Sequence, residues 1–370
     1  MKVCFLIYDL GSGGAERTVA YLSNYAVTHE TQVDIVVYGD SKTIYNIDEK
    51  VNIIKLDVNY AKTIKSKIKR VFNVFENYRN ISKAFNNYVK TNNPDVIFCM
   101  LSDSILYALK AKKKVPIIGS ERSNPYWTTS FIQKFKRKYL FNKLDGIVFQ
   151  TQRAQDFYVK SVKNPIKVVI PNAVGNDLVY STEYNPSNYQ HKIGAVGSLR
   201  AQKDYPTMIN AFKKFKQSHS DYVLEIFGDG KDKDNLIQLT KDLQLDDSVI
   251  FKGIHNDALK QISNHAFYVM SSISEGMPNA LMEAMAIGMP CISTDCNNGP
   301  AELINNNENG ILVPIQDVDA LCNAMCKMAD DRQFAEKCGQ NAKMLKETNS
   351  VDTISKKYFE FIQNIINKRK

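Results

Sequence analysis

The sequence predicts an α/β protein with two Rossmann-like, doubly wound parallel-sheet domains that face each other across a cleft. Apolar runs of strand length alternate with segments of helical period along the whole chain, which is the pattern of parallel sheets covered by helices. A polar stretch without periodicity interrupts this series once, near the middle. The 370 residues are 44% hydrophobic and 24% charged, so the chain can bury two cores of ordinary size.

Seven apolar runs in the first half have the length of strands. They are Val3–Ile7, Val33–Tyr38, Val51–Leu56, Asp95–Met100, Pro116–Gly119, Gly146–Gln150 and Lys167–Ile170. Six more runs follow the interruption, at Ile193–Gly197, Val223–Gly228, Val249–Gly253, Phe267–Ser271, Pro290–Thr294 and Gly310–Val313. The amphipathic pattern at the C-terminus predicts one last helix.

These runs divide the chain into four segments. We expect an N-terminal domain over residues 1–170, a linker over 171–190, a C-terminal domain over 191–349 and a terminal helix over 350–370. Ligands of open α/β sheets bind beyond the carboxyl ends of the strands. We therefore expect the active site at those edges, where the two domains face each other.

Charge is distributed unevenly along the chain. Residues 1–170 contain 27 Lys and Arg against 14 Asp and Glu, a net charge of +13, whereas the remainder carries −4 of the total +9. This excess predicts an anionic partner, such as nucleic acid, a phospholipid surface or a diphosphate-bearing substrate. Nucleic acid is disfavoured, because no recognised binding module accompanies the charge.

Two segments, Ala61–Asn73 and Phe131–Lys143, combine apolar residues at helical spacing with clusters of Lys and Arg. Such helices are typical of membrane-surface segments, although ordinary surface helices with buried apolar stripes would give the same pattern. On the first interpretation Lys65, Lys69, Arg137 and Lys138 contact an anionic membrane. No run is long enough to span a bilayer, and seven cysteines without a C-x-x-C pair are expected to be reduced thiols. We therefore expect a cytoplasmic protein on the inner face of the plasma membrane.

A glycine-rich loop, Gly11–Arg17, lies between the first strand and a helix. Glycines such as Gly13 and Gly14 let a backbone approach a phosphate at a helix N-terminus. A dinucleotide-binding domain uses the same position, but Glu16 stands where its fingerprint requires Gly or Ala.

Two glutamates flank the expected start of a helix in the second half. Glu275 lies in a loop after a strand, and Glu283 lies about one turn into the helix. If Asn279 is the N-cap, the amides of Ala280 and Leu281 are free to bind an anion. This arrangement suits a nucleotide sugar, although a surface acid and an acid that complements the helix dipole would give the same spacing.

Basic residues and glycines follow two other strands of the second half. Arg200 and Lys203 are three residues apart after its first strand, and Gly228 ends the next run. The two cations can neutralise a departing diphosphate, and the three segments converge on one edge of the sheet.

Taken together, these motifs resemble the retaining glycosyltransferases of family 4, which have the B-type (GT-B) two-lobe fold. The resemblance extends over essentially the whole chain and is greatest to enzymes that build bacterial capsule, O-antigen, lipopolysaccharide and exopolysaccharide glycans. It is carried by Gly13–Arg17, Ser120–Pro125, Val169–Asn172, Gly197–Lys203, Phe227–Gly230, Glu275–Glu283 and Gly299–Glu302.

The resemblance implies a role for each motif. Arg200 and Lys203 would hold the donor diphosphate, Glu275 the transferred sugar and Glu283 the ribose, while Gly13 and Gly14 line the cleft. The first domain, with Arg122, would bind the acceptor and the second domain the nucleotide sugar, and the terminal helix would pack back on the first domain. The implied reaction moves a hexose or N-acetylhexosamine from a UDP-sugar to a lipid-diphosphate-linked or oligosaccharide acceptor, with retention of configuration.

Many relatives carry a histidine near the reacting carbon where this chain has Arg122, so a general base is not identified. The close pairs of acidic residues in this chain, which could hold a metal, stand at expected helix starts, where acids act as caps. We therefore expect neither a metal nor another cofactor. Two other functions fit the same donor site: a nucleotide-sugar epimerase on the same fold, and a non-catalytic subunit that binds sugar nucleotides.

Overall fold

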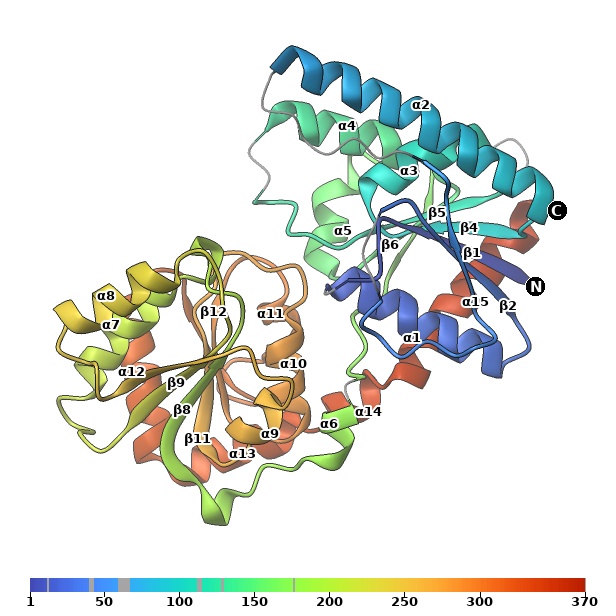
Figure 1. The fold of residues 1–370 in the computed structure, drawn as a ribbon. Coiled ribbons are helices and arrows are strands. Elements are labelled where there is room, and N and C mark those ends of the chain that lie inside the picture. The colour runs from blue at the N-terminus through green and yellow to red at the C-terminus, as the bar shows by residue number, and fades with distance from the viewer. Residues whose placement is uncertain are drawn as a thin grey trace. The chain divides into compact units, whose positions relative to one another are not determined.

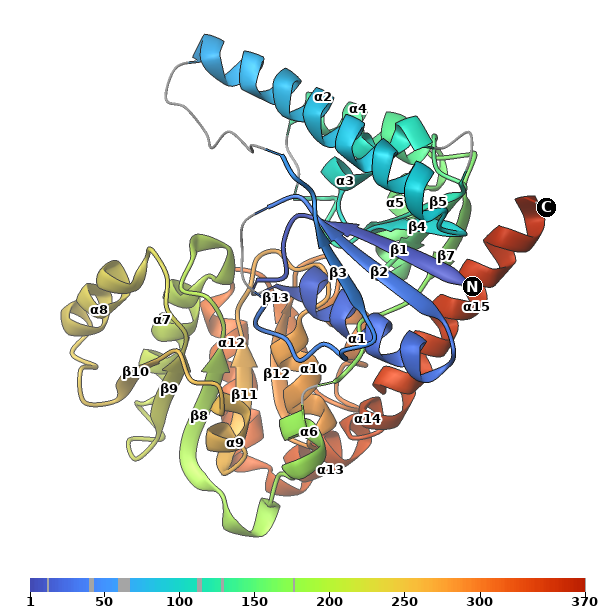
Figure 2. The same ribbon diagram turned by 45° about the vertical axis from the view of Figure 1, so that its right-hand side comes forward.

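The structure is a computed structural model that describes residues 1–11, 13–39, 43–58, 67–111, 115–127, 130–175 and 177–369. The chain forms two compact units: Met1–Ala173 together with Val351–Lys370, and Val174–Ser350. Each unit is a parallel sheet covered by helices on both faces (Figures 1 and 2). The predicted α/β class with two parallel sheets is confirmed.

The sheet of the first unit has the strand order β3-β2-β1-β4-β5-β6-β7 among the residues described. Its strands are β1 Lys2–Ile7, β2 Gln32–Val37, β3 Asn52–Lys55, β4 Val96–Cys99, β5 Ile117–Glu121, β6 Gly146–Phe149 and β7 Ile166–Val169. Each of the seven predicted runs is a strand, with bounds within two residues of those expected. The runs are predictable because parallel strands buried on both faces are apolar almost throughout.

Helices cover both faces of this sheet (Figure 1). They are α1 Gly14–Thr28, α2 Lys67–Asn92, α3 Ser102–Ala108, α4 Phe131–Phe141, α5 Gln152–Val159 and α15 Val351–Arg369, with a 3-10 turn η1 at Leu109–Ala111. One face packs against residues of α2, α3, α4 and α5. The other packs against α1 and α15, whose Ile354, Tyr358 and Ile365 are buried.

The second unit contains a six-stranded sheet in the order β10-β9-β8-β11-β12-β13 within the described range. Its strands are β8 Gln190–Val196, β9 Val223–Phe227, β10 Val249–Gly253, β11 His265–Met270, β12 Cys291–Asp295 and β13 Ile311–Pro314. All six predicted runs are confirmed as strands, with bounds that differ by at most three residues. In β11, Phe267 and Val269 face one core, whereas Tyr268 and Met270 face the other.

Helices again cover both faces of the second sheet. Their bounds are α6 Asp177–Ser181, α7 Tyr205–Phe215, α8 Lys233–Asp242, α9 Ala258–Ile262, α10 Asn279–Ala286, α11 Pro300–Leu303, α12 Val318–Asp330, α13 Arg332–Ala342 and α14 Leu345–Thr348, with 3-10 turns η2 Pro186–Asn188 and η3 Ala201–Lys203. Residues of α7, α8, α12 and α13 form one core and those of α9, α10 and α11 the other.

Both sheets reverse their strand order once, between β1 and β4 in the first and between β8 and β11 in the second. In doubly wound folds this reversal is where the ligand crevice opens, at the carboxyl ends of the strands. All seven cysteines are free thiols, as predicted. Among the residues that the structure describes, no helix combines the length and apolar character that a membrane span requires.

Candidate functional site

The predicted donor residues of the second unit meet where its strand order reverses. The loop after β8 carries Lys203, and the loop after β11 carries Glu275. Lys203 Nζ donates to Glu275 Oε1 at 2.6 Å. The Lys203 side chain is 21% exposed and that of Glu275 is 11% exposed, so this ion pair lies at the margin of the core. The cation expected at the diphosphate is thus bound directly to the acid expected at the sugar.

Hydrogen bonds hold these two loops together. Ser271 Oγ, at the end of β11, lies 2.9 Å from the carbonyl oxygens of both Lys203 and Asp204. The amide of Ile273 donates to the carbonyl of Gln202 at 2.9 Å. Asp204 has a left-handed backbone with φ 47°, which turns the loop into α7. Because the loop is fixed from both sides, the position of Lys203 is fixed as well.

Gly228 allows the neighbouring loops to approach each other closely. Its φ is +147°, and a Cβ built there would lie 1.9 Å from the carbonyl oxygen of Gly197. The amide of Gly197 in turn donates to Phe227 O at 2.9 Å. A side chain at position 228 would therefore push the loop after β9 away from the loop that carries Arg200 and Lys203.

Glu275 precedes helix α10 and Glu283 lies within it, and this helix begins one residue earlier than expected. Pro278 rather than Asn279 occupies the cap position, without a side-chain cap, so the prediction of an Asn279 cap was wrong. The first helical hydrogen bond runs from Met282 N to Pro278 O, which leaves the amides of Ala280 and Leu281 without partners inside the helix. Glu283 is half-buried one turn further along.

Sequence reasoning missed the groups that hold the Glu275 loop. Ser272 Oγ donates to Glu275 Oε1 at 2.7 Å, and the buried Asn298 side chain donates to the carbonyls of Glu275 and Gly276 at 3.1 Å. Asn298 stands directly before the Gly299–Glu302 motif, which was the available signal. Burial, and then the negative charge of Glu275, raise the pKa of the Cys296 thiol to about 12.

Arg200 differs from Lys203 in its surroundings. It is exposed at the start of η3, and within the described part of the chain its guanidinium makes no ion pair or hydrogen bond. The edge thus presents one exposed guanidinium, one ammonium with donors beyond the one used by Glu275, and helix amides. This combination suits an anionic group such as a diphosphate.

The predicted residues of the first unit lie at the corresponding edge of its own sheet. Gly13 is at the cap position of α1 and Gly14 is its first residue. Arg122, after β5, donates from Nη2 to Thr18 Oγ1 at 2.7 Å, to Asn172 Oδ1 at 2.6 Å and to Gly14 O at 3.3 Å. Its Nη1 also donates to Tyr358 OH at 3.4 Å. Arg122 therefore ties α1, α15 and the end of the β7 segment together.

The basic residues expected at a membrane are placed unequally. Arg137, in α4, is half-buried, and its Nη1 lies 3.3 Å from Oε2 of the buried Glu121. Arg137 thus faces the protein rather than an external surface, contrary to the expectation. Lys138 is half-buried in the same helix. Lys65 lies outside the described residues, and Lys69 is in α2 but its side chain is not among those described.

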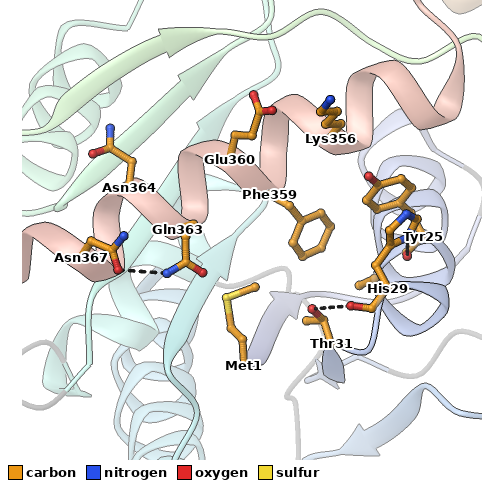
Figure 3. Close-up of a pocket in the computed structure, with 11 residues that line it drawn as sticks. Met1, Tyr25, His29, Thr31, Lys356, Phe359, Glu360, Gln363, Asn364 and Asn367 are labelled. Atoms are coloured by element: carbon orange, nitrogen blue, oxygen red, sulfur yellow. Dashed lines mark hydrogen bonds between the residues drawn. The ribbon is translucent and has the colours of Figure 1, made fainter.

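A surface pocket of about 600 Å³ lies in the first unit between the end of α1 and α15 (Figure 3). Its lining includes Met1, Tyr25, His29 and Phe359. Met1 precedes β1, so the pocket opens at the amino ends of the strands, opposite the carboxyl edge that holds Arg122. It is therefore separate from the predicted ligand edge of the first sheet.

Comparison with known families assigns a model to each half of the chain. Residues 12–177 match the model described as Glycosyltransferase Family 4, and residues 181–345 match the model described as Glycosyl transferases group 1. The predicted resemblance to family 4 is confirmed.

One relative, from Campylobacter jejuni, is 25% identical over 377 residues that cover 99% of both chains. Its name is GalNAc-alpha-(1->4)-GalNAc-alpha-(1->3)-diNAcBac-PP-undecaprenol alpha-1,4-N-acetyl-D-galactosaminyltransferase.

Two solved structures illustrate the shared fold. Sucrose-phosphate synthase from Thermosynechococcus elongatus has a TM-score of 0.83 at 17% identity, with 99% of both chains covered. The pneumococcal O-GlcNAc transferase, in complex with UDP and GlcNAc, has a TM-score of 0.77 at 14% identity, again over 99% of both chains. These similarities show that the chain has the GT-B fold, which is built from two Rossmann-like units.

Proposed function

This chain belongs to the glycosyltransferases whose family 4 and group 1 models match its two halves, and on that premise we propose its reaction. It transfers a hexose or N-acetylhexosamine from a UDP-sugar to a sugar acceptor and retains the configuration of the donor. The observation that carries this proposal is the Lys203–Glu275 pair at the strand reversal of the second sheet. A site that binds a sugar diphosphate needs a cation for the phosphates and, within a few ångströms, a group that accepts hydrogen bonds from the sugar hydroxyls. Lys203 and Glu275 supply these two groups.

The donor would be held by groups already fixed in the second unit. The diphosphate lies against Arg200, Lys203 and the amides of Ala280 and Leu281, and Glu283 accepts hydrogen bonds from the ribose hydroxyls. The two cations supply the positive charge that the departing diphosphate requires, so we propose a reaction without a metal or another cofactor. The pneumococcal structure with UDP and GlcNAc supports a UDP-linked donor on this fold.

Retention follows if leaving group and nucleophile use the same face of the sugar. The bond between the anomeric carbon and the phosphate oxygen breaks, and the acceptor hydroxyl oxygen bonds to that carbon. The proton of the hydroxyl passes to the departing phosphate oxygen. Glu275 binds the sugar as positive charge develops on it, while Lys203 and Arg200 stabilise the negative diphosphate. This route needs no imidazole at position 122, where the chain carries arginine.

We further propose that the acceptor is a lipid-diphosphate-linked glycan of bacterial surface-polysaccharide synthesis, reached at the cytoplasmic face of an anionic membrane. Two observations support it. Residues 1–170 carry a net charge of +13 that the donor does not require. The Campylobacter jejuni relative, which covers the whole chain, names an undecaprenol diphosphate glycan as its substrate.

A donor screen tests the reaction. The protein is incubated with nucleotide sugars and a short soluble acceptor, nucleotide release is measured, and the anomeric configuration of the product is determined by NMR. We expect acceptor-dependent UDP release and a product with the donor's configuration. Conversion of the donor into another sugar without acceptor would instead indicate an epimerase, and an intact donor under all conditions would indicate a binding subunit.

A further inference from the structure

Helix α4 presents large apolar residues to solvent, whereas its Arg137 faces the protein. Phe131, Ile132, Phe135 and Tyr139 are 80%, 78%, 64% and 55% exposed, and together they form what we call the outer face of α4. They lie on one side of the helix, because residues three and four apart share a face. The helix buries only its last two residues, Leu140 and Phe141.

Ion pairs connect other residues of α4 to the rest of the first unit. Arg137 pairs with the buried Glu121 and also donates to Ser123 Oγ at 3.0 Å. Lys136 Nζ lies 2.8 Å from Asp103 Oδ1, at the start of α3. These contacts fix the rotation of the helix about its axis, so the aromatic side cannot turn inward without breaking them.

Helix α7 of the second unit shows the usual orientation. It has the same length of 11 residues and also carries lysines, Lys213 and Lys214. Its apolar residues are buried, among them Met208, Ile209 and Phe212, and both lysines are exposed. The apolar side of α4 therefore faces solvent, whereas the apolar side of an ordinary surface helix faces the core.

Basic residues accompany the outer face. Residues 59–143 contain 18 Lys and Arg and four Asp and Glu, whereas residues 1–58 contain five and eight. The excess positive charge of the first unit thus comes from the segment that includes α4. Lys134 and Lys138 are half-buried on α4 itself and form no ion pair among the residues described.

The outer face lies close in sequence to the carboxyl edge of the first sheet. Strand β5 ends at Glu121, Arg122 follows, and α4 begins at Phe131 after a loop. That loop carries Tyr126 and Trp127, which are 47% and 51% exposed. Nine residues therefore connect the start of α4 to the end of β5, at the sheet edge where the acceptor is expected.

From this geometry we propose that the outer face of α4, together with Trp127, is the docking surface for an anionic lipid bilayer. Large aromatic side chains enter the interface between headgroups and acyl chains, and lysines beside them contact anionic headgroups. The concentrated positive charge favours a lipid surface over a second copy of the chain, because two such segments would repel each other. The inference deepens the proposed lipid-linked acceptor by naming the surface that brings the enzyme to it.

Trp127 provides a direct probe, because it is the sole tryptophan in the sequence. The full chain is mixed with vesicles of phosphatidylcholine alone or of phosphatidylcholine with phosphatidylglycerol. We expect Trp127 emission to shift to shorter wavelength with the anionic vesicles and to be quenched by lipids brominated on their acyl chains. The measurement needs neither donor nor acceptor, so its outcome is independent of the transferase assay.

Variants then separate insertion from charge. Replacing Phe131, Phe135 and Tyr139 together by Ser should lower binding to anionic vesicles by roughly tenfold or more, because the apolar contact is lost. Lys134→Gln with Lys138→Gln should lower it by roughly fivefold for each lysine. Matched controls in the second unit are Ile254→Ser with Met344→Ser and Lys213→Gln with Lys241→Gln, which replace exposed residues and should leave binding unchanged.

Every variant should keep the wild-type melting temperature and its transfer to a short soluble acceptor. The proposal is overturned if Trp127 emission does not change with vesicles of either composition, or if the α4 variants bind anionic vesicles as well as the control variants do. It is overturned equally if emission shifts with protein concentration alone and sedimentation shows a dimer, because a second copy would then cover this face.

Discussion

The two sheets share the order of their first six strands, but the cations at their carboxyl edges are used differently. In the second unit Arg200 is exposed, and Lys203 is bound to one carboxylate, that of Glu275. In the first unit Arg122 is half-buried and donates to four oxygen atoms, two in α1, one in α15 and one in the segment after β7. The same architecture therefore holds available charge at one edge and structural charge at the other.

The difference follows from counting donors. An ammonium has three N–H donors, and Lys203 gives one to Glu275, so it keeps capacity for a ligand. The Arg122 guanidinium has five N–H donors, and both of its terminal nitrogens donate to protein oxygens. Substitutions at the first edge should therefore act mainly on stability, whereas those at the second should lower turnover, with an added cost in stability only where Lys203 pairs with Glu275.

The largest effect is expected at the second edge. Lys203→Ala or Arg200→Ala should lower turnover by about a hundredfold, on the order of 3 kcal/mol of leaving-group stabilisation. The loss of turnover is measured as the steady-state rate of nucleotide release with saturating donor. If both variants kept near wild-type turnover, the assignment of the diphosphate to these residues would be lost.

Their stabilities should separate the two cations. Arg200 is exposed, so its removal should leave the melting temperature unchanged. Among the described residues, Lys203→Ala leaves the carboxylate of Glu275 with the Ser272 hydroxyl as its only side-chain donor, and it should cost roughly 1–2 kcal/mol of unfolding free energy. Lys203→Arg is the matched control, because it keeps the charge and a donor for Glu275.

At the first edge, Arg122→Ala should act on stability. The loss of its bonds to Thr18, Asn172 and Gly14 should lower the unfolding free energy by about 2 kcal/mol. Denaturant melts monitored by circular dichroism measure this change. Arg122→Lys, which keeps the charge but loses the branched geometry, should recover only part of it.

Kinetics provide the counter-test for Arg122. Turnover on a soluble acceptor at a temperature where the variant is folded should fall much less than in Lys203→Ala. A hundredfold loss of turnover with unchanged stability would show that Arg122 contacts a ligand, and the contrast between the two edges would fail.

A smaller effect should separate the two glutamates within the second edge. Glu283→Ala should raise the donor Michaelis constant by about tenfold with little change in turnover, because ribose contacts hold ground state and transition state alike. Glu275→Ala should instead lower turnover, because it contacts the sugar on which charge develops. If steady-state kinetics gave the reverse phenotypes, the two roles would be exchanged.

Sequence patterns predicted the strands and the common sheet edge of the loops that carry Lys203 and Glu275, because both depend on local order along the chain. A parallel strand buried on both faces is an apolar run, and the loop that follows it must lie at the carboxyl edge of the sheet. The meeting of Lys203 and Glu275 follows from strand neighbours β8 and β11, although the 2.6 Å contact between residues 72 positions apart does not.

The orientation of α4 was not predictable in the same way. Its sequence alternates aromatic and basic residues, so the pattern defines two faces without telling which one is inward. That choice depends on Glu121 and Asp103, which pair with Arg137 and Lys136 from distant positions. The support of Glu275 by Asn298 was missed for a related reason, since its bonds are to backbone carbonyls across 22 and 23 positions.

The smallest expected effect concerns Glu16, in the first turn of α1. Its carboxylate folds back over Gly13, where a built Cβ would lie 2.1 Å from Oε2. Burial, followed among the raising effects by the negative charge of Asp9, raises the pKa of Glu16 above its usual 4.5. A carboxyl whose folded pKa is raised contributes stability that is fully present below pH 4.5 and is lost as pH rises through the folded value.

Glu16→Gln should therefore stabilise the protein at neutral pH, by less than about 1 kcal/mol because solvent screens a half-exposed group. The gain should disappear below pH 4.5, where the wild-type carboxyl is protonated as well. Denaturant melts of both proteins across this range measure the difference. A destabilised variant at neutral pH would mean that the attraction of the carboxylate to the helix N-terminus outweighs its burial. Lost turnover at unchanged stability would place Glu16 at a ligand and would contradict a purely structural role of the first edge.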